Sequence, residues 1–199
     1  MEIKKANLDI SEILTLQTQW TIDWHDNATE PLDNAPWKFI ELNHRMNFDL
    51  WHEEDVARRD DLPAERIKQA KRAIDKYNQA LNDAMEKIDT WIESTIPPFS
   101  SDAGLHSETP GMMIDRLSIM SLKKYLMKLE AEREDASQEH QLKCSQKVMV
   151  LEEQISDLSN CLSLLIEELY TGKKKFKIYR QHKMYNDPTL NPQLYKKTN

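Results

Sequence analysis

The chain has 199 residues, 39% of them hydrophobic and 31% charged, a length and composition that fit one compact domain. Only 3 residues are glycine, fewer than the turns of a strand-rich fold require, so we expect an all-α protein. The net charge of −7 argues against a nucleic-acid-binding protein.

The beginning of the chain and its two cysteines predict where the protein resides. The first residues, MEIKKANLDISEIL, lack the continuous apolar core of a signal peptide, and no segment approaches the roughly 20 apolar residues of a membrane span. We therefore expect a cytoplasmic protein with no membrane span. Cys144 and Cys161 lie about 25 Å apart along one predicted helix, too far for a disulfide, so we expect two free, buried thiols.

Prolines and glycines divide the chain into a series of predicted helices, because they interrupt long stretches of regular apolar spacing. The expected elements are a short helix at 8–24, a hairpin of helices 37–60 and 64–96, a second hairpin of helices 110–134 and 139–171, and a C-terminal strap at 172–199. Two long hairpins imply an antiparallel helical bundle. No Gly or Pro breaks the chain near 135–138, so one bent helix over 110–171 is the alternative to the second hairpin.

Apolar residues recur at alternating three- and four-residue steps along the two longest predicted helices. In helix 64–96 this pattern runs from Ile67 to Trp91, and it predicts a packing seam. In helix 139–171 it runs from Cys144 to Leu169, followed by a glycine that is typical of a helix end.

Polar residues interrupt the inward-facing stripe of helix 37–60. Asn43, Asn47 and Glu54 share one helical face with apolar neighbours. A second polar stripe lies beside the apolar seam of helix 64–96 and consists of Lys71, Asp75, Asn78, Asn82 and Asp89. Burial of such a group without a partner costs about 1–3 kcal/mol, so these residues must bond to one another, to water or to a ligand.

The short loop at 61–63 predicts how the first two long helices pair, because residues of an antiparallel hairpin whose numbers sum to about 125 then face each other. The facing polar pairs are Glu54 with Lys71, Asn47 with Asn78, and Asn43 with Asn82. One interpretation is a buried network that fixes the register of the hairpin. The other is a ligand or active-site pocket, because crowded titratable groups often have shifted pKa values. Further side chains that crowd the same end are Trp51, His52, Asp55, Arg58 and Arg72.

Two carboxylate-to-histidine pairs, Glu41 with His44 and Asp49 with His52, have the three-residue spacing used in di-iron bundles. Both pairs lie on one predicted helix, with their histidines about 12 Å apart along its axis. This separation argues against a shared metal ion, so we expect no metal site. No P-loop, dinucleotide-binding glycine pattern or paired CxxC occurs, and no cofactor is implied by a motif.

Charge is distributed unevenly along the chain. Residues 171–199 contain eight Lys and Arg against Asp187 alone, a net charge of +7, whereas the other 170 residues contain 19 basic and 33 acidic side chains, a net charge of −14. We therefore expect the tail to fold back on the acidic bundle as a strap. Contact with nucleic acid or phosphate is the alternative for its basic and aromatic residues.

Four sequence blocks resemble a known family. They are LWHEEDVARR at 50–59, KRAIDKYNQALND at 71–83, SETPGMMIDRLSIMSLK at 107–123 and KMYNDPTLNPQLY at 183–195. In this order the blocks resemble the bacterial domain-of-unknown-function family 4254. The resemblance implies a bacterial, cytoplasmic helical protein and a loose association with gene neighbourhoods for cell-surface glycan synthesis. The pattern of the family falls on the polar cluster of the first hairpin, namely Trp51, His52, Glu54, Asp55 and Arg58.

The third block adds a second candidate surface at the start of helix 110–134. Thr109 and Pro110 are typical N-cap and first-turn residues, and the free N–H groups of a helix start bind anions. Arg116 is suited to a bidentate contact with phosphate or carboxylate. The alternative is a capped helix start with a surface pair of Asp115 and Arg116.

These patterns lead to one functional hypothesis and one alternative. We expect a polar pocket between helices 37–60 and 64–96, closed by the C-terminal strap, that binds or acts on an anionic small molecule such as a sugar phosphate or nucleotide sugar. The alternative is a non-enzymatic scaffold protein whose seams mediate homodimerisation and whose polar stripe is structural.

Specific residues carry this hypothesis. Lys71, Arg72 and Arg58 are expected to hold the anion. The candidate acids and bases are Glu54, Asp55 and Asp75, with His52 as the proton carrier. The other ligand-binding candidates come from the hairpin, the second surface and the strap: Asn47, Trp51, Asn78, Asn82, Asp115, Arg116, Lys183, Tyr185 and Asn186.

Overall fold

The computed structural model describes residues 8–26, 30–180 and 187–192, and within these ranges the regular structure is helical except for two short strands. The elements in chain order are α1 (Ile10–Asp26), α2 (Trp37–Ala57), α3 (Ala64–Thr95), β1 (Gly104–Leu105), α4 (Pro110–Glu132), α5 (Gln138–Tyr170) and β2 (Lys174–Lys175). The all-α prediction is therefore confirmed.

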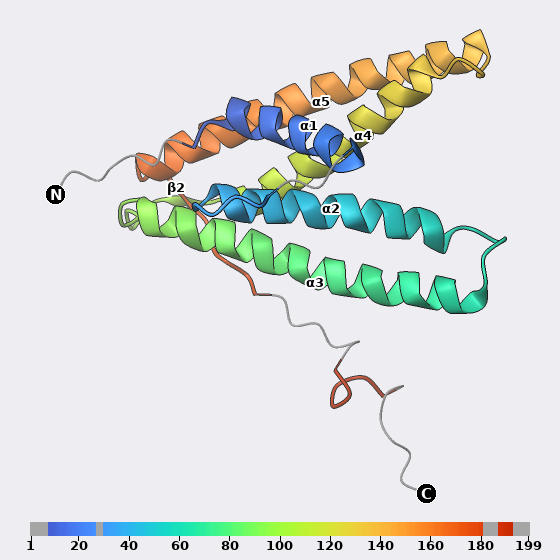
Figure 1. Cartoon of the computed structure of the whole chain (residues 1–199). Coiled ribbons are helices and arrows are strands. Elements are labelled where there is room, and N and C mark those ends of the chain that lie inside the picture. The colour runs from blue at the N-terminus through green and yellow to red at the C-terminus, as the bar shows by residue number, and fades with distance from the viewer. Residues whose placement is uncertain (1–7, 27–29, 181–186, 193–199) are drawn as a thin grey trace, which may run out of the picture.

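The helices form two arms that meet at one end and separate at the other (Figure 1). α2 and α3 lie side by side in one arm and α4 and α5 in the other, whereas α1 contacts α2, α4 and α5. α4 ends before Arg133, whose ψ of 112° is extended, and the Ser137 hydroxyl accepts a hydrogen bond from His140 N–H at the start of α5. Residues 110–171 thus form two separate helices rather than one bent helix.

The hydrophobic core lies where the two arms meet, far from the turns that end them. The predicted seams supply much of it, because their apolar residues share one face of each helix. The most deeply buried apolar side chains are Ile13, Ile40, Ile88, Ile92, Ile114, Leu117, Leu122, Leu162, Leu165 and Leu169. The start of α4 contributes to this core and bonds to both α2 and α3.

The start of α4 packs very close to α3. Thr109 caps α4 by accepting a hydrogen bond from Met112 N–H. A Cβ on Gly111 would lie 2.7 Å from the Met85 carbonyl oxygen and 2.9 Å from the carboxyl carbon of Asp89. Only glycine therefore allows this approach, which brings Asp89 of α3 to the first turn of α4.

The chain after α5 is fastened beside the loop that leads into α4. β2 pairs in parallel with β1, with Gly104 opposite Lys174. Phe176 is buried next to this ladder, and its ring packs edge-on against Phe99. Residues 178–180 consequently reach a pocket beside α3 and α4.

The structure bears on the predictions for a membrane span and for the two cysteines. Within the described ranges 8–26, 30–180 and 187–192, no helix combines the length and apolar character needed to cross a membrane. Cys144 and Cys161 are both free thiols, as predicted. The predicted burial of Cys161 is wrong, because its side chain lies on the exposed side of α5.

Candidate functional site

The inward-facing amides of α2 are buried, as predicted, but their partner lies on α4. Asn43 and Asn47 donate hydrogen bonds to Asp115 Oδ1, at 3.0 and 2.8 Å. Asn47 also donates to the Ser118 hydroxyl, at 3.0 Å. One carboxylate oxygen and one hydroxyl on α4 thereby satisfy amides that would be costly to bury alone.

His44 extends this network to α1. Its ring is fully buried, with Nδ1 2.7 Å from the Ser118 hydroxyl and Nε2 2.9 Å from the Thr21 hydroxyl. The Thr21 hydroxyl donates to the Gln17 carbonyl, so its oxygen accepts from Nε2–H, and Nδ1 then accepts from Ser118. Burial lowers the pKa of His44 to about 3, with a small opposing effect of the Gln17 backbone, so the ring is neutral at pH 7.

The polar side chains predicted to pair between α2 and α3 do not bond to one another. Glu53, rather than Glu54, bridges the two helices, and its carboxylate accepts hydrogen bonds from Arg66 at 2.9 and 3.0 Å. Glu54 pairs along its own helix with Arg58, at 3.0 Å. α2 ends at Ala57, earlier than predicted, and the charged side chains near its end pair with the neighbours that they reach there.

Asp89 of the polar stripe of α3 bonds to the start of α4, whereas other members of the stripe bond within the helix. Asn78 and Asn82 donate to carbonyl groups one turn earlier, at 3.0 and 2.7 Å. Lys71 pairs with Asp75 at 2.7 Å, and Arg72 lies exposed next to Lys71. The cluster of cations expected between α2 and α3 is therefore not formed, since charged side chains find partners on their own helix.

Part of the predicted cluster does come together, in a hollow of about 290 Å³ between α2 and α4. The predicted residues that line it are Asn47, Trp51, Glu54, Asp55 and Arg58. His52 is not in this lining, and its exposed ring contacts the rings of Phe48 and His25. Partial burial and the neighbouring His25 lower the pKa of His52.

A more polar pocket, of about 410 Å³, lies at the start of α4 beside α3 and residues 178–180. We call it the α4 pocket; besides two glutamates its lining contains Asp89 of α3 and Asp115 of α4. Asp89 is only 3% exposed, and it accepts hydrogen bonds from the Gly111 N–H, at 2.6 Å, and from the Thr109 hydroxyl. Burial raises the pKa of Asp89 to about 6 and also raises the pKa of Asp115.

Asp115 presents one free oxygen. Its Oδ1 accepts from two amides, whereas Oδ2 accepts no hydrogen bond from any described residue. The one enclosed side-chain atom without a partner in the described ranges is Asn43 Oδ1, so Asp115 Oδ2 is accessible. The carboxyl group of Asp115 therefore ends a chain of hydrogen bonds that runs from His44 through Ser118 and Asn47 to Oδ1.

The first turn of α4 is not free to bind an anion, contrary to the sequence prediction. The Gly111 N–H bonds to Asp89, and the N–H groups of Met112 and Met113 bond to the side chain and the carbonyl of Thr109. A carboxyl group of the protein itself thus occupies the position that an anion would take at a helix start.

The two arginines at the rim of the α4 pocket are paired with glutamates. Arg116 Nη1 bonds to both carboxylate oxygens of Glu108, at 2.8 and 3.0 Å, and not to Asp115 as one alternative predicted. Arg180 Nη1 lies 3.0 Å from the Glu86 carboxylate. The charges of these pairs cancel, so the two aspartates give the pocket an acidic balance that repels anions.

The sequence model of the family described as "Protein of unknown function (DUF4254)" matches residues 37–178, most of the chain. The chain belongs to the DUF4254 family. No curated protein matches the chain, and no solved structure matches it either. The matched range holds α2–α5 and both aspartates of the α4 pocket, so the site lies within the DUF4254 domain. Thr21 of α1 and the rim residues Tyr179 and Arg180 lie outside it.

Sequence patterns do not identify several residues of the α4 pocket. Asp89 falls on the predicted polar stripe, but nothing in the sequence connects it with α4. Glu86 carries no signal, and Arg180 is marked only as one of the basic residues of the tail. One usable signal is Gly111, because a glycine inside the first turn of a helix indicates a close approach. Three strap residues predicted to bind ligand lie outside the described residues, namely Lys183, Tyr185 and Asn186.

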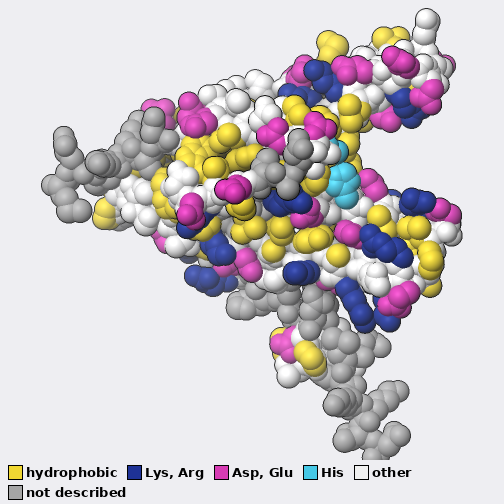
Figure 2. Space-filling view, in the orientation of Figure 1, with side chains coloured by type: hydrophobic (Ala, Val, Ile, Leu, Met, Phe, Trp, Pro, Cys, Tyr) yellow, Lys and Arg dark blue, Asp and Glu magenta, His cyan; other side chains and the backbone are white. Residues whose placement is uncertain are grey.

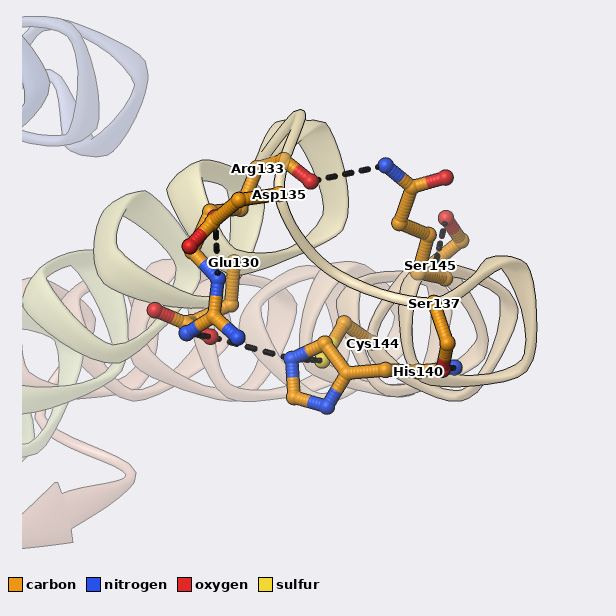
Figure 3. A network of polar contacts seen from close by, with 8 residues as sticks. Glu130, Arg133, Asp135, Ser137, His140, Cys144 and Ser145 are labelled. Carbon is orange, nitrogen blue, oxygen red and sulfur yellow. Dashed lines mark hydrogen bonds and ion pairs between the residues drawn. The ribbon is translucent and has the colours of Figure 1, made fainter.

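A separate polar cluster closes the turn between α4 and α5 of the DUF4254 domain (Figure 3). Glu130 Oε2 lies 2.9 Å from His140 Nε2 and 2.8 Å from Arg133 Nη1, and the Cys144 thiol lies 3.4 Å from the same histidine nitrogen. These groups satisfy one another, so the cluster has a structural explanation. Throughout the described ranges, no three His, Cys, Asp or Glu side chains are placed so that they could hold a metal ion.

Proposed function

We propose that this protein is a bacterial, cytoplasmic DUF4254 protein whose α4 pocket binds the sugar part of a small molecule of cell-surface glycan metabolism. The observation that carries the proposal is the accessible Oδ2 of Asp115, fixed by two buried amides. Sugar hydroxyls donate hydrogen bonds to carboxylates, and they both donate to and accept from amides. The same pocket contains the amide of Asn82 and, at its rim, Tyr179. The two free thiols support a reducing compartment.

The charge of the α4 pocket favours a neutral group over an anionic one. Arg116 and Arg180 are already paired with Glu108 and Glu86, and two further carboxyl groups line the walls. A phosphate placed here would be repelled by these carboxylates. For a sugar phosphate or a nucleotide sugar, we therefore assign the sugar, rather than the phosphate, to this pocket.

Asp115 is also the group in the α4 pocket best suited to move a proton. Burial raises the pKa of its carboxyl group, and general acid–base catalysis is most efficient when that pKa approaches the working pH. Asp89 is enclosed by Gly111 and Thr109, so its role is to position the start of α4. In a reaction of the bound sugar, Asp115 Oδ2 would accept a hydroxyl proton.

Asp115→Asn is expected to abolish sugar binding while leaving the fold intact. Asn43 and Asn47 would still bond to the amide oxygen, which leaves an N–H donor where the acceptor Oδ2 now lies. Thermal shift against neutral sugars, sugar phosphates and nucleotide sugars measures the effect, because ligand at a hundredfold excess over Kd stabilises a protein by about 2.7 kcal/mol. The matched control is Asp75→Asn, on α3 outside the pocket.

The wild type and Asp75→Asn should respond to the same sugar-bearing compounds, and Asp115→Asn to none of them. A wild type that responds to no compound of the panel, or an Asp115→Asn protein that keeps the response, would refute the proposal. Circular dichroism of each variant shows whether the helices are retained.

A second candidate function, self-association as a scaffold protein, is favoured by a different surface. An apolar groove of about 700 Å³ lies between the separated arms, where Figure 2 shows the molecule hollowed. Its walls include Trp51 of α2, Leu126 and Leu129 of α4, and Val150 of α5. Leu129 and Val150 are 47% and 51% exposed, and exposed apolar surface of this kind is typical of protein interfaces.

Val150→Asp is expected to weaken a dimer formed through this groove at least about tenfold, because it places a charge in the apolar interface. Light scattering over a wide range of protein concentration measures the effect. Leu164→Asp is the matched control, since Leu164 is an exposed apolar residue of the same helix that does not line the groove. A wild type that stays monomeric, or a dimer that Val150→Asp leaves intact, excludes this interface.

A further inference from the structure

A cavity of about 350 Å³ lies between the end of α1, the start of α2 and α3. It shares no lining residue with the α4 pocket. The lining side chains that determine its chemistry are Trp24, Lys38, Phe39, Glu41, Arg45 and Lys87. We call it the cationic cavity, because three of these six side chains are basic.

The cationic cavity attracts anions although the whole protein carries a net charge of −7. Its three basic side chains face Glu41 as the acidic residue of the described lining, and Arg45 also pairs with Asp49, which leaves a net charge of +1. Glu41 is buried, and its Oε2 accepts the Leu32 N–H at 2.6 Å. Within the described part of the chain, neither Lys38 nor Lys87 forms an ion pair. Two ammonium groups are thus left to bind an external anion.

Arg45 is held in a fixed orientation at the wall of the cavity. Its guanidinium carbon lies 5.0 Å from the ring centroid of Trp24 and 5.4 Å from that of Phe48. Its Nε lies 3.0 Å from Asp49, and no hydrogen bond to a described residue occupies Nη1 or Nη2. The two terminal nitrogens therefore remain for a bidentate contact, and little entropy is lost when they bind.

Aromatic rings complete the cavity. Phe39 and Trp24 both line it, and the ammonium of Lys38 lies 5.4 Å from the Phe39 ring centroid. Rings beside cations suit a molecule with an organic part next to its negative charge, because the organic part can pack on the rings or on the guanidinium plane.

We propose that the cationic cavity binds the phosphate group of a small organic phosphate, with Arg45, Lys38 and Lys87 as its ligands. A phosphate monoester carries between one and two negative charges at pH 7 and has three acceptor oxygens. It therefore matches three cations better than a single carboxylate does. The organic part packs against Trp24 and Phe39. This site is separate from the proposed sugar pocket and does not depend on it.

The test is calorimetric titration of the full chain at low salt with three probes, namely ADP, glucose 6-phosphate and inorganic phosphate. Lys87→Gln is expected to weaken binding of an organic phosphate at least about tenfold, because it removes one charge-assisted hydrogen bond. Lys76→Gln, an exposed lysine of the same helix outside the cavity, should bind as the wild type does. Added salt should weaken binding, since the site is partly open to solvent.

The two organic probes distinguish the sources of the phosphate. Tighter binding of ADP shows that the rings hold a base, and equal binding of both organic probes shows that the phosphate dominates. Either result supports the site if Lys87→Gln loses the binding. No binding, binding of inorganic phosphate alone, or binding retained by both Lys87→Gln and Lys38→Gln overturns it. Asp115→Asn should leave phosphate binding intact, so failure here and failure of the sugar pocket are separate results.

Discussion

Acidification from pH 7 to pH 4 is expected to lower the free energy of unfolding by about 3 kcal/mol through His44 alone. The buried ring has a pKa of about 3, against an ordinary value of 6.5. Above pH 6.5 the ring is neutral in the folded and the unfolded protein, and its contribution to stability is complete. Below that pH the unfolded chain takes up a proton that the folded ring does not accept, so stability is lost as the pH falls towards the folded pKa.

Urea unfolding of the wild type, His44→Gln and His52→Gln between pH 7 and pH 4 tests this effect. His44→Gln should be less stable at pH 7, since it loses hydrogen bonds to Ser118 and Thr21, but it should lose about 3 kcal/mol less on acidification. His52→Gln is the comparison, because this ring is exposed and should change the pH profile much less. Equal losses in the wild type and in His44→Gln would contradict a neutral buried ring.

The helices could be predicted because apolar periodicity determines them. The seams that run to Trp91 in α3 and to Leu169 in α5 repeat over many turns, so they predict both the helix and the face that packs. Helix ends depend on only a few residues, which explains why the early end of α2 at Ala57 could not be read from the sequence. Glu54 likewise does not bond to Lys71 as predicted, whereas Glu53, to which the pattern gave no role, bonds to Arg66.

The buried polar residues could be predicted, but their partners could not. Periodicity places Asn43 and Asn47 on the inward face of α2, where the structure buries them. Their partner Asp115 lies about seventy residues later, on α4, and the whole of α3 separates α4 from α2 in the sequence. Which inward face meets which depends on how whole helices pack, and a local pattern does not contain that information.

Charge density along the sequence is also a poor guide to the electric field at a site. The charged residues around Arg58 and Lys71 suggested an anion site, yet both side chains pair with acids one turn away on their own helices. The cationic cavity instead takes Lys38, Arg45 and Lys87 from two helices, and no motif joins them. Its Arg45 pairs with Asp49, but its two lysines form no ion pair within the described part of the chain.

α3 separates the two sites by charge. Glu86 and Asp89 line the α4 pocket, whereas Lys87, the residue after Glu86, lines the cationic cavity. Successive residues of an α-helix point about 100° apart, so one helix can present acids to one site and a base to another. A carbohydrate hydroxyl and a phosphate are therefore expected to bind on different faces of α3.

Asp89→Asn is expected to stabilise the protein at pH 8 by about 3 kcal/mol, and to leave its stability at pH 4 nearly unchanged. Burial raises the pKa of Asp89 from 3.8 to about 6. Below pH 3.8 the Asp89 carboxyl is protonated in both the folded and the unfolded protein, and its contribution to stability is complete. As the pH rises through 6, the folded protein must hold a buried carboxylate that the unfolded chain exposes to water. The contribution of Asp89 to stability is therefore lost. Asparagine carries no charge and keeps an oxygen for the Gly111 N–H.

Chemical unfolding at both pH values measures this gain, with Asp83→Asn, an exposed carboxyl group of the same helix, as the control that should change little. The sign of the result at pH 8 decides between two physical effects. A more stable Asp89→Asn protein means that desolvation of the carboxylate outweighs its hydrogen bonds to Gly111 and Thr109. A less stable one means that the positive end of the α4 dipole and these two donors favour the charged form more than desolvation opposes it.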